Sequence, residues 1–290
     1  MLKKIGTLLL LMGWTITLFV GCYAAPEAPT LASTPYSSQT SNPASSTQIT
    51  TLPGTTPTSQ PVTVPATQPT TAPTTQPATP PKVICIDAGH QQSGIWDTEP
   101  NGPGSDVMKA KLSSGTQGVA TRIPEYQLNL DVSLLLETEL LARGYQVVMI
   151  RRTNDCPLSN AERAQIANES GADIFIRIHA NGSDNASING MLCCAPTQNN
   201  PFLTQQVITE SIRLSDIMTK MFCAATGANN QGIYYVDTMT GINWCQIPVT
   251  IVEMGYMSNP DEDRAMASPE YQQKMVTGIA DGIDAYFAST

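Results

Sequence analysis

The break in composition near Lys82 decides how much of this 290-residue chain can fold into a compact domain. Residues 23–81 hold 13 of the 22 prolines and 16 threonines, and Glu27 is their one charged residue. Such a segment has too few large apolar side chains to offset the entropy lost on ordering, so we expect an unfolded, extended tether. Residues 82–290 remain for a single folded domain, which is enough chain for one hydrophobic core.

The start of the chain predicts export from the cytoplasm. Two lysines precede an uncharged, apolar stretch over residues 5–21, which is the pattern of a secretory signal. A small glycine before Cys22 resembles the lipobox of bacterial lipoproteins, in which residues 1–21 are a signal peptide and the cysteine is lipidated. Residues 22–81 are then the lipidated cysteine and its Thr/Pro/Ser-rich linker. The alternative is an uncleaved membrane anchor, for which the apolar stretch is at the short end.

The domain is acidic and carries no cluster of lysine or arginine. The formal charge of the chain is −9, and it becomes −11 when Lys3 and Lys4 are removed with the signal peptide. Proteins that bind nucleic acid rely on basic side chains to neutralise phosphates. We therefore expect no nucleic-acid partner.

Apolar patterns in residues 82–290 alternate between strand and helix. Strand-like stretches lie at 82–87, 145–152, 173–179, 190–196 and 249–254, and helical spacing occurs at 125–144, 159–172, 204–227 and 268–288. Ser159 and Glu162 form a capping-box pattern at one helix start, and Gly144 is a natural stop for another helix. The alternation predicts a layered α/β domain with a largely parallel sheet, whose ligands gather at the carboxyl ends of the strands.

The chain has only two histidines, and both stand where a predicted strand ends. His90 closes the stretch "VICIDAGH", and His179 follows the apolar residues of "DIFIRIHAN". A single histidine at a strand end is usually a hydrogen-bonding residue. Two together favour a metal site, because a hydrolytic zinc site takes three protein ligands from His, Asp and Glu and leaves a fourth position to water.

The third ligand should be a carboxylate, and Glu125 is the best candidate. It opens a strong helical pattern after the long Gly-rich and polar loop at 91–124. Its position alone also fits a favourable charge at a helix N-terminus. Asp97 and Glu99, both inside the loop, are weaker rivals.

A second carboxylate, Glu253, lies in the apolar stretch "IPVTIVEMGYMSN". A buried strand does not normally carry an acid, so this side chain is expected to be paired, metal-bound or functional. Asp87, three residues before His90, has two interpretations: it orients that imidazole, or it caps the following loop.

Four sequence blocks, in order, resemble the zinc-dependent N-acetylmuramoyl-L-alanine amidases of the amidase-3 type. The blocks are "VICIDAGHQ", "EYQLNLDVSLLLETELLARGYQVVMIRRTND", "ERAQIANESGADIFIRIHAN" and "PVTIVEMGYMSNPDED", and the resemblance covers residues 82–287. It implies a three-layer sandwich like that of zinc exopeptidases, with a mixed, largely parallel sheet flanked by helices. It also implies one zinc ion held by His90, Glu125 and His179, with Glu253 as the catalytic carboxylate.

The resemblance further implies the reaction and its location. Such an enzyme hydrolyses the amide bond between the lactyl group of N-acetylmuramic acid and L-alanine, so the expected partner is peptidoglycan. The lipidated Cys22 would then anchor the enzyme in the membrane, facing the bacterial cell wall. The alternatives are a catalytically inactive wall-binding lipoprotein of the same fold and a zinc peptidase that acts on other peptides. The sequence identifies no protein activator.

The chain departs from the family pattern at two places. Arg177 stands where the family often has a small serine, and the loop between His90 and Glu125 is longer than in compact members. Arg151, Arg152 and Arg163 either anchor loops or contact substrate carboxylates, and the sequence leaves both interpretations open. The six cysteines after Cys22 are expected to be mostly buried free thiols rather than three disulfides: Cys85, Cys156, Cys193, Cys194, Cys223 and Cys245.

Overall fold

A computed structural model describes residues 81–289 of the chain. The expected signal peptide at 1–21 and nearly all of the linker at 22–81 lie outside the described residues. Within 81–289, no helix combines the length and the apolar character that crossing a membrane requires. The six cysteines of the described part are free thiols, four of them buried.

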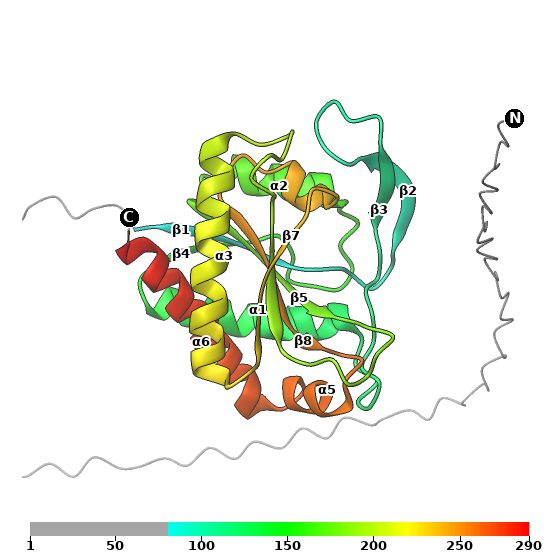
Figure 1. Ribbon diagram of the computed structural model, residues 1–290, viewed down its shortest axis with the longest axis vertical. Helices are drawn as coiled ribbons and strands as arrows, with labels where there is room; N and C mark the ends of the chain where they lie inside the picture. The colour runs from blue at the N-terminus through cyan, green and yellow to red at the C-terminus, as the bar shows by residue number, and fades with distance from the viewer. Residues whose placement is uncertain (1–80, 290) are drawn as a thin grey trace, which may run out of the picture. The chain divides into compact units, whose positions relative to one another are not determined.

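The domain is built on a six-stranded sheet (Figure 1). Its strands in spatial order are β4 (Gln146–Met149), β1 (Val83–Ala88), β5 (Ile174–Asn181), β8 (Val249–Tyr256), β6 (Met191–Ala195) and β7 (Asn230–Tyr235). Every neighbouring pair runs parallel except β8 and β6, which are antiparallel. The predicted mixed, largely parallel sheet is therefore confirmed.

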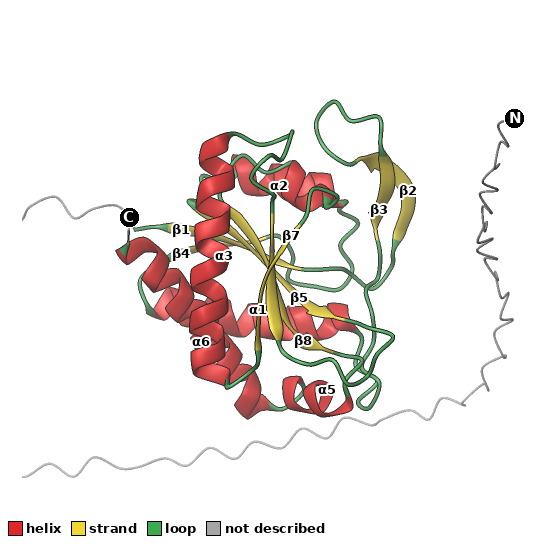
Figure 2. Ribbon diagram, viewed as in Figure 1, coloured by secondary structure: helices red, strands yellow, loops and turns green. Residues whose placement is uncertain are grey.

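Helices cover both faces of this sheet (Figure 2). They are α1 (Glu125–Ala142), α2 (Asn160–Glu169), α3 (Gln205–Thr226), α4 (Thr240–Asn243), α5 (Pro260–Met266) and α6 (Pro269–Ala288). The helices α1, α3 and α6 contribute to one apolar cluster against the sheet, whereas α2 and α4 contribute to a second cluster on the opposite face. This arrangement confirms the three-layer sandwich.

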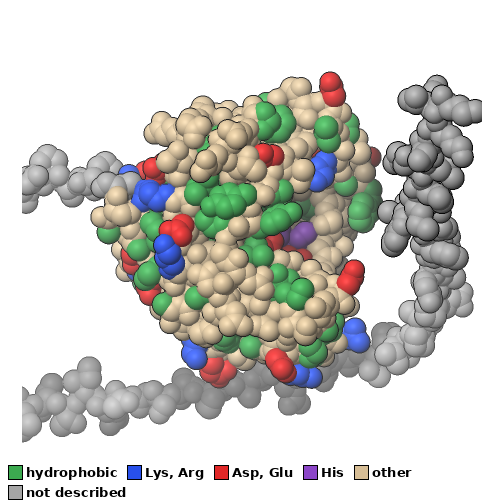
Figure 3. Space-filling model, in the orientation of Figure 1, with side chains coloured by type: hydrophobic (Ala, Val, Ile, Leu, Met, Phe, Trp, Pro, Cys, Tyr) green, Lys and Arg blue, Asp and Glu red, His purple; other side chains and the backbone are tan. Residues whose placement is uncertain are grey.

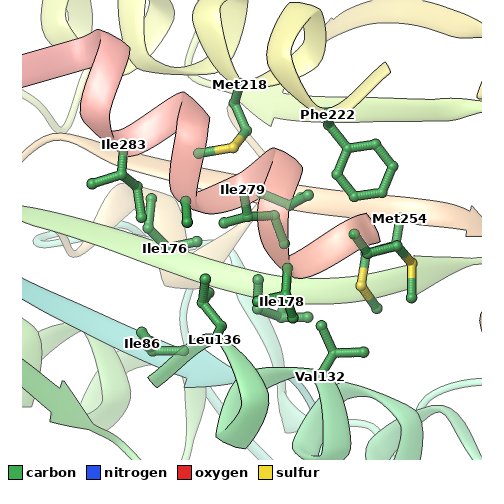
Figure 4. Close-up of a cluster of buried hydrophobic side chains, with 14 of the residues drawn as sticks. Ile86, Val132, Leu136, Ile176, Ile178, Met218, Phe222, Met254, Ile279 and Ile283 are labelled. Atoms are coloured by element: carbon green, nitrogen blue, oxygen red, sulfur yellow. The ribbon is translucent and has the colours of Figure 1, made fainter. Parts of the chain in front are cut away.

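The cluster under α1, α3 and α6 is the larger of the two. Figure 4 shows how it forms: side chains from these helices meet strand residues that point to the same face. The residues labelled there are Ile86, Val132, Leu136, Ile176, Ile178, Met218, Phe222, Met254, Ile279 and Ile283. Side chains alternate along each strand, so Asp87 of β1, His179 of β5 and Glu253 of β8 face the opposite side, where the candidate site lies.

Local sequence fixes the ends of the main helices. Ser159 accepts a hydrogen bond from the Glu162 backbone N–H, and the Glu162 side chain accepts one from the Ser159 N–H, so the predicted capping box is confirmed. Thr204 and Ser268 cap α3 and α6 in the same manner through their hydroxyl oxygens. Gly144, which follows α1, has a φ of 88°.

The segment expected to be an irregular loop contains a β-hairpin. The strands β2 (Ile95–Pro100) and β3 (Met108–Leu112) pair antiparallel and form a separate two-stranded sheet (Figure 2). Their side chains are mostly exposed, so their sequences lack the apolar alternation of a half-buried strand. The hairpin matters for the site, because one part of it lines the cavity described below.

Candidate metal centre

Three side chains from distant parts of the chain bring donor atoms together. His90 follows β1, Glu125 opens α1 and His179 lies in β5. Glu125 Oε1 lies 3.2 Å from His90 Nε2 and 3.3 Å from His179 Nδ1. The ligand atoms of all three lie within 4.8 Å of one another, which is a group able to hold a metal ion. The rivals Asp97 and Glu99 are not in this group; Glu99 instead accepts a hydrogen bond from the Ala161 N–H.

The His90 imidazole is oriented by the loop that follows the hairpin. Its Nδ1 lies 2.8 Å from the backbone oxygen of Ser113, and a carbonyl oxygen can only accept, so Nδ1 carries the proton. In the neutral imidazole, the lone pair of Nε2 is then free for a metal. His90 adopts a φ of 61°, which is unusual for a residue with a side chain. Among residues 81–289, neither His90 nor a backbone N–H of the following loop forms a hydrogen bond with Asp87, which accepts from Arg163 and Arg177 instead, so both interpretations of Asp87, as a partner that orients His90 and as a loop cap, are wrong.

Two glycines give the imidazoles room. A Cβ at Gly89 would overlap the ring of His179. A Cβ at Gly115 would lie 2.5 Å from Glu125 Oε2 and 2.9 Å from the ring of His90. Gly115 also has a φ of 83°, which a side chain would disfavour. The close approach of the three donors therefore depends on bare backbone at both positions.

Glu125 is nearly enclosed, with 3% of its surface exposed. Oε2 accepts a hydrogen bond from the Thr116 N–H (2.9 Å), and Oε1 accepts bonds from the Ala180 N–H and the Asn129 amide (3.2 Å each). Burial alone would raise the pKa of this carboxyl, but its interactions with His179 and His90 hold the pKa well below its ordinary value. The group is thus an ionised carboxylate, as a metal ligand must be.

His179 is suited to bind a metal as a neutral imidazole. Burial lowers its pKa to about 4, against the raising effect of Glu125. Its Nε2 is buried and has no hydrogen-bond partner among the described residues, while Nδ1 points to Glu125. The pKa of His90 is raised, because the hydrogen bond and charge of Glu125 outweigh its burial. The carboxylate between the rings thus attracts a cation, either a proton or a metal.

Glu253 lies next to this group but outside it. In the parallel pairing of β5 with β8 it is the partner of His179. Burial, followed by the negative charge of Glu125, raises its pKa to about 8, while His90 and Arg177 act in the opposite direction. A carboxyl group with a pKa near neutrality, in a cavity beside metal-binding side chains, has the properties of a general acid and base.

A cavity of about 250 Å³ opens beside the three donors. Its lining combines the site with the β2–β3 hairpin and with the segment that leads into α4: His90, Lys109, Ala110, Leu112, Asn160, Arg177, His179, Thr238, Met239, Thr240, Gly241, Ile251 and Glu253. In Figure 3, histidine surface (purple) shows in a recess of the domain. The site is therefore open to a ligand from outside.

Two buried arginines donate hydrogen bonds to the end of β1 and to the residues that follow it. Arg163 donates to Asp87 Oδ1 (2.6 Å), to the His90 carbonyl oxygen (3.2 Å) and to Gln91 Oε1 (2.8 Å). Arg151 donates to the carbonyl oxygens of residues 88 and 89. These two arginines therefore anchor the backbone that carries His90. The sequence left this role open, because nothing in it pairs an arginine with a carbonyl 60 to 75 residues away.

Comparisons with known proteins agree on one family. A family model described as N-acetylmuramoyl-L-alanine amidase matches residues 84–285, which is more than half of the chain. Among solved structures, the N-acetylmuramyl-L-alanine amidase Ami1 from Mycobacterium smegmatis is 26% identical with a TM-score of 0.66, and the match covers 72% of this chain and 98% of that one.

Two curated proteins are each 28% identical to this chain. The match to N-acetylmuramoyl-L-alanine amidase Rv3717 of Mycobacterium tuberculosis covers 71% of this chain and 87% of that protein. The match to N-acetylmuramoyl-L-alanine amidase LytC of Bacillus subtilis covers 56% of this chain but only 31% of LytC, so it spans less than a third of that relative's length. The similarity thus lies in the domain that contains the site.

Proposed function

The chain belongs to the N-acetylmuramoyl-L-alanine amidase family, and from this premise we propose that it hydrolyses the amide bond between the lactyl group of N-acetylmuramic acid and L-alanine in peptidoglycan. The observation that carries the proposal is the convergence of two imidazoles and a carboxylate, with Glu253 beside them, in a domain that this family matches along nearly its whole length. The comparisons do not favour an inactive wall-binding protein or a peptidase for other peptides.

The proposed metal is one zinc ion, held by His90 Nε2, Glu125 Oε1 and His179 Nδ1. Donor atoms around a tetrahedral zinc ion, each bound at roughly 2.0–2.1 Å, lie about 3.3 Å apart. The two distances to Glu125 Oε1, 3.2 and 3.3 Å, fit this spacing, and imidazole and carboxylate are ligands that zinc accepts. When bound, zinc lowers the pKa of a water ligand and polarises the scissile carbonyl group.

Glu253 is proposed as the group that moves the proton. Its carboxylate takes a proton from the attacking water and delivers it to the departing alanine nitrogen. A group that performs both transfers works best when its pKa lies near the working pH, and burial raises the pKa of Glu253 to about 8. Its place in the cavity, outside the set of mutually close donors, leaves it free for this role.

The proposed location of the enzyme rests on the sequence of residues that lie almost entirely outside the described structure. Residues 1–21 are proposed as a signal peptide, Cys22 as the lipidated anchor in the membrane and residues 22–81 as the tether, which presents the domain at 82–290 to the cell wall. Labelling of the producing cells with radioactive palmitate tests the anchor. The full chain should be labelled, Cys22→Ser should not, and labelling of both would contradict the proposal.

Digestion of purified peptidoglycan tests the reaction. Mass spectrometry of the soluble products should find free stem peptides whose amino terminus is L-alanine, and glycan strands that keep intact lactyl groups. Glu253→Gln provides the matched control for a contaminating hydrolase, because it preserves size and fold. Products cut within the stem peptide, or none at all from zinc-loaded protein, would contradict the proposed function.

A further inference from the structure

Arg177 lines the cavity beside the proposed metal centre, and one of its nitrogens forms no hydrogen bond with the residues that the structure describes. Nε donates to Asp87 Oδ2 (2.9 Å), and Nη2 donates to Asn160 Oδ1 (2.7 Å) and lies 2.9 Å from Asp87 Oδ2. Nη1 makes no hydrogen bond within residues 81–289, although Arg177 is only 3% exposed. A guanidinium has five N–H donors, so two of them remain available to a ligand in the cavity.

The positive charge around Arg177 is only partly balanced. The Asp87 carboxylate lies between the guanidiniums of Arg163 and Arg177, and all three side chains are buried. Two cations and one anion leave one positive charge in a region where water cannot screen it well, an arrangement that favours a further anion. Glu253 forms no ion pair with Arg177 in the described part of the chain.

The surroundings hold the guanidinium in a fixed position. Asn160, at the start of α2, accepts from Nη2 and donates to the Lys111 carbonyl oxygen of the hairpin (2.9 Å). Gly241 in α4 lies directly against Nη1, and a Cβ at that position would overlap this nitrogen. Asn160 and Gly241 both line the cavity, so Nη1 is presented there by elements from three parts of the chain.

Arg177 and His179 reach the same cavity from neighbouring positions on one face of β5. Their Cα atoms are roughly 6–7 Å apart, which is the spacing of alternate residues in a strand. In peptidoglycan the residue after L-alanine is glutamate joined through its side-chain carboxyl, which leaves its α-carboxylate free unless it is amidated. That carboxylate follows the scissile nitrogen by little more than one residue, which is about 5–6 Å of extended chain.

We propose that Arg177 Nη1 binds the α-carboxylate of this second stem residue, and that the enzyme thereby prefers stems in which the group is not amidated. The inference rests on the proposed function and concerns the same cavity. A carboxylate accepts charge-assisted hydrogen bonds from the guanidinium and balances its charge. A carboxamide is neutral, and its NH₂ group offers no acceptor to Nη1. Arg177 is thus a specificity-determining residue on the peptide side of the scissile bond.

A matched pair of muramyl tripeptides tests this proposal. The two substrates differ only in whether the second residue has an α-carboxylate or an α-carboxamide. The wild-type protein should cleave the acid with a kcat/KM roughly 10- to 100-fold higher, which is the range that one hydrogen bond to a charged group contributes. Arg177→Met should bring the ratio of the two kcat/KM values close to one, and this ratio tests the proposal even where the loss of the pairing with Asp87 lowers both values.

Two further variants separate binding from folding. Gly241→Ala would place a methyl group against Nη1 and Cζ of Arg177, so it should displace the guanidinium and reduce the preference, and thermal unfolding of this variant measures whether the fold is retained. Lys109→Met is the matched control, because Lys109 is the other cation that lines the cavity and its Nζ donates to the Thr238 carbonyl oxygen. This variant should keep the preference for the acid. Calorimetry measures the Kd of the two released stem peptides, and the peptide with the free α-carboxylate should bind more tightly than the amidated one.

The outcomes distinguish this inference from the proposed function. Equal kcat/KM for the two substrates in the wild type would overturn the carboxylate site and leave the amidase function intact. A preference that is lost in Lys109→Met but kept in Arg177→Met would also overturn it. Cleavage of neither substrate, nor of whole peptidoglycan, by zinc-loaded protein would overturn the proposed function, and the inference would fall with it.

Discussion

His179 and Glu253 occupy paired positions on the neighbouring parallel strands β5 and β8. Side chains at paired positions leave the same face of a sheet, so both reach the same cavity. Only His179 belongs to the set of donor atoms within 4.8 Å of one another. The proposed roles, a metal ligand for His179 and a proton carrier for Glu253, can therefore be tested separately.

Glu253→Gln should retain the metal and lose most of its activity. The amide cannot accept a proton from water, and a well-placed general acid and base contributes roughly 10²–10⁴-fold. The release of stem peptides measures the rate, and elemental analysis of the dialysed protein measures the zinc. A variant with wild-type turnover would remove Glu253 from the mechanism.

His179→Ala should lose the metal itself. The substitution removes one of three protein ligands and leaves the Glu125 carboxylate with one imidazole partner. Elemental analysis should find much less than one zinc per chain, and added zinc should restore activity to chelator-treated wild type but not to the variant. Tight binding of zinc by His179→Ala would show that other side chains hold the ion.

Arg163→Met should destabilise the domain strongly. It leaves the Asp87 carboxylate with one guanidinium and removes the bonds that anchor the His90 backbone. Loss of one partner of a buried pair costs about 3–5 kcal/mol, which corresponds to a fall in Tm of roughly 6–20 °C for a domain of this size. Arg152→Met is the matched control, because that arginine pairs with Glu137 at the surface, where such a pair contributes at most about 1 kcal/mol. Similar Tm values for the two variants would contradict the structural role of Arg163.

The metal-free protein should become less stable as the pH rises from 6.5 to 8. Burial, then the charge of Glu125, raises the pKa of Glu253 from 4.5 to about 8. In this range the folded chain holds a proton that the unfolded chain has released, so raising the pH favours unfolding. His90, whose pKa is also raised, adds to this fall, whereas His179, whose pKa is lowered to about 4, opposes it near pH 6.5, where the unfolded histidine still holds part of a proton.

Thermal unfolding of chelator-treated protein at several pH values measures this effect. The fall in Tm should be smaller in Glu253→Gln, which has no proton to release. Zinc should also reduce it, because a nearby cation favours the ionised carboxylate. An equal fall in Glu253→Gln and wild type would assign the effect to other groups.

Most of the fold could be predicted from local sequence patterns. The strands β1, β5 and β8 are apolar runs, and the Ser159–Glu162 capping box marks the start of α2. The elements that were missed are short or exposed. The hairpin strands carry mainly exposed side chains, β7 contains Gly232, and α4 has only four residues, so none of them shows a clear apolar period.

The site could be predicted only in part, for a different reason. His90 and His179 are recognisable because they are scarce and stand at strand ends. The partners that orient them are backbone atoms, such as the Ser113 carbonyl oxygen, and any residue type supplies those. The role of Asp87 could not be read either, because its partners Arg163 and Arg177 lie 76 and 90 residues away in the chain.

Gly89 and Gly115 help to decide whether a relative of this protein can be active. A methyl group at position 89 would push the His179 imidazole aside, although the sequence would still contain every ionisable residue of the site. A relative with this substitution would keep all the ligand residues and would be classified as an active hydrolase from them, although the added methyl group would prevent its histidine from reaching the metal position. The glycines at positions 89 and 115 are therefore as informative about whether a relative is active as the histidines and glutamates of the site.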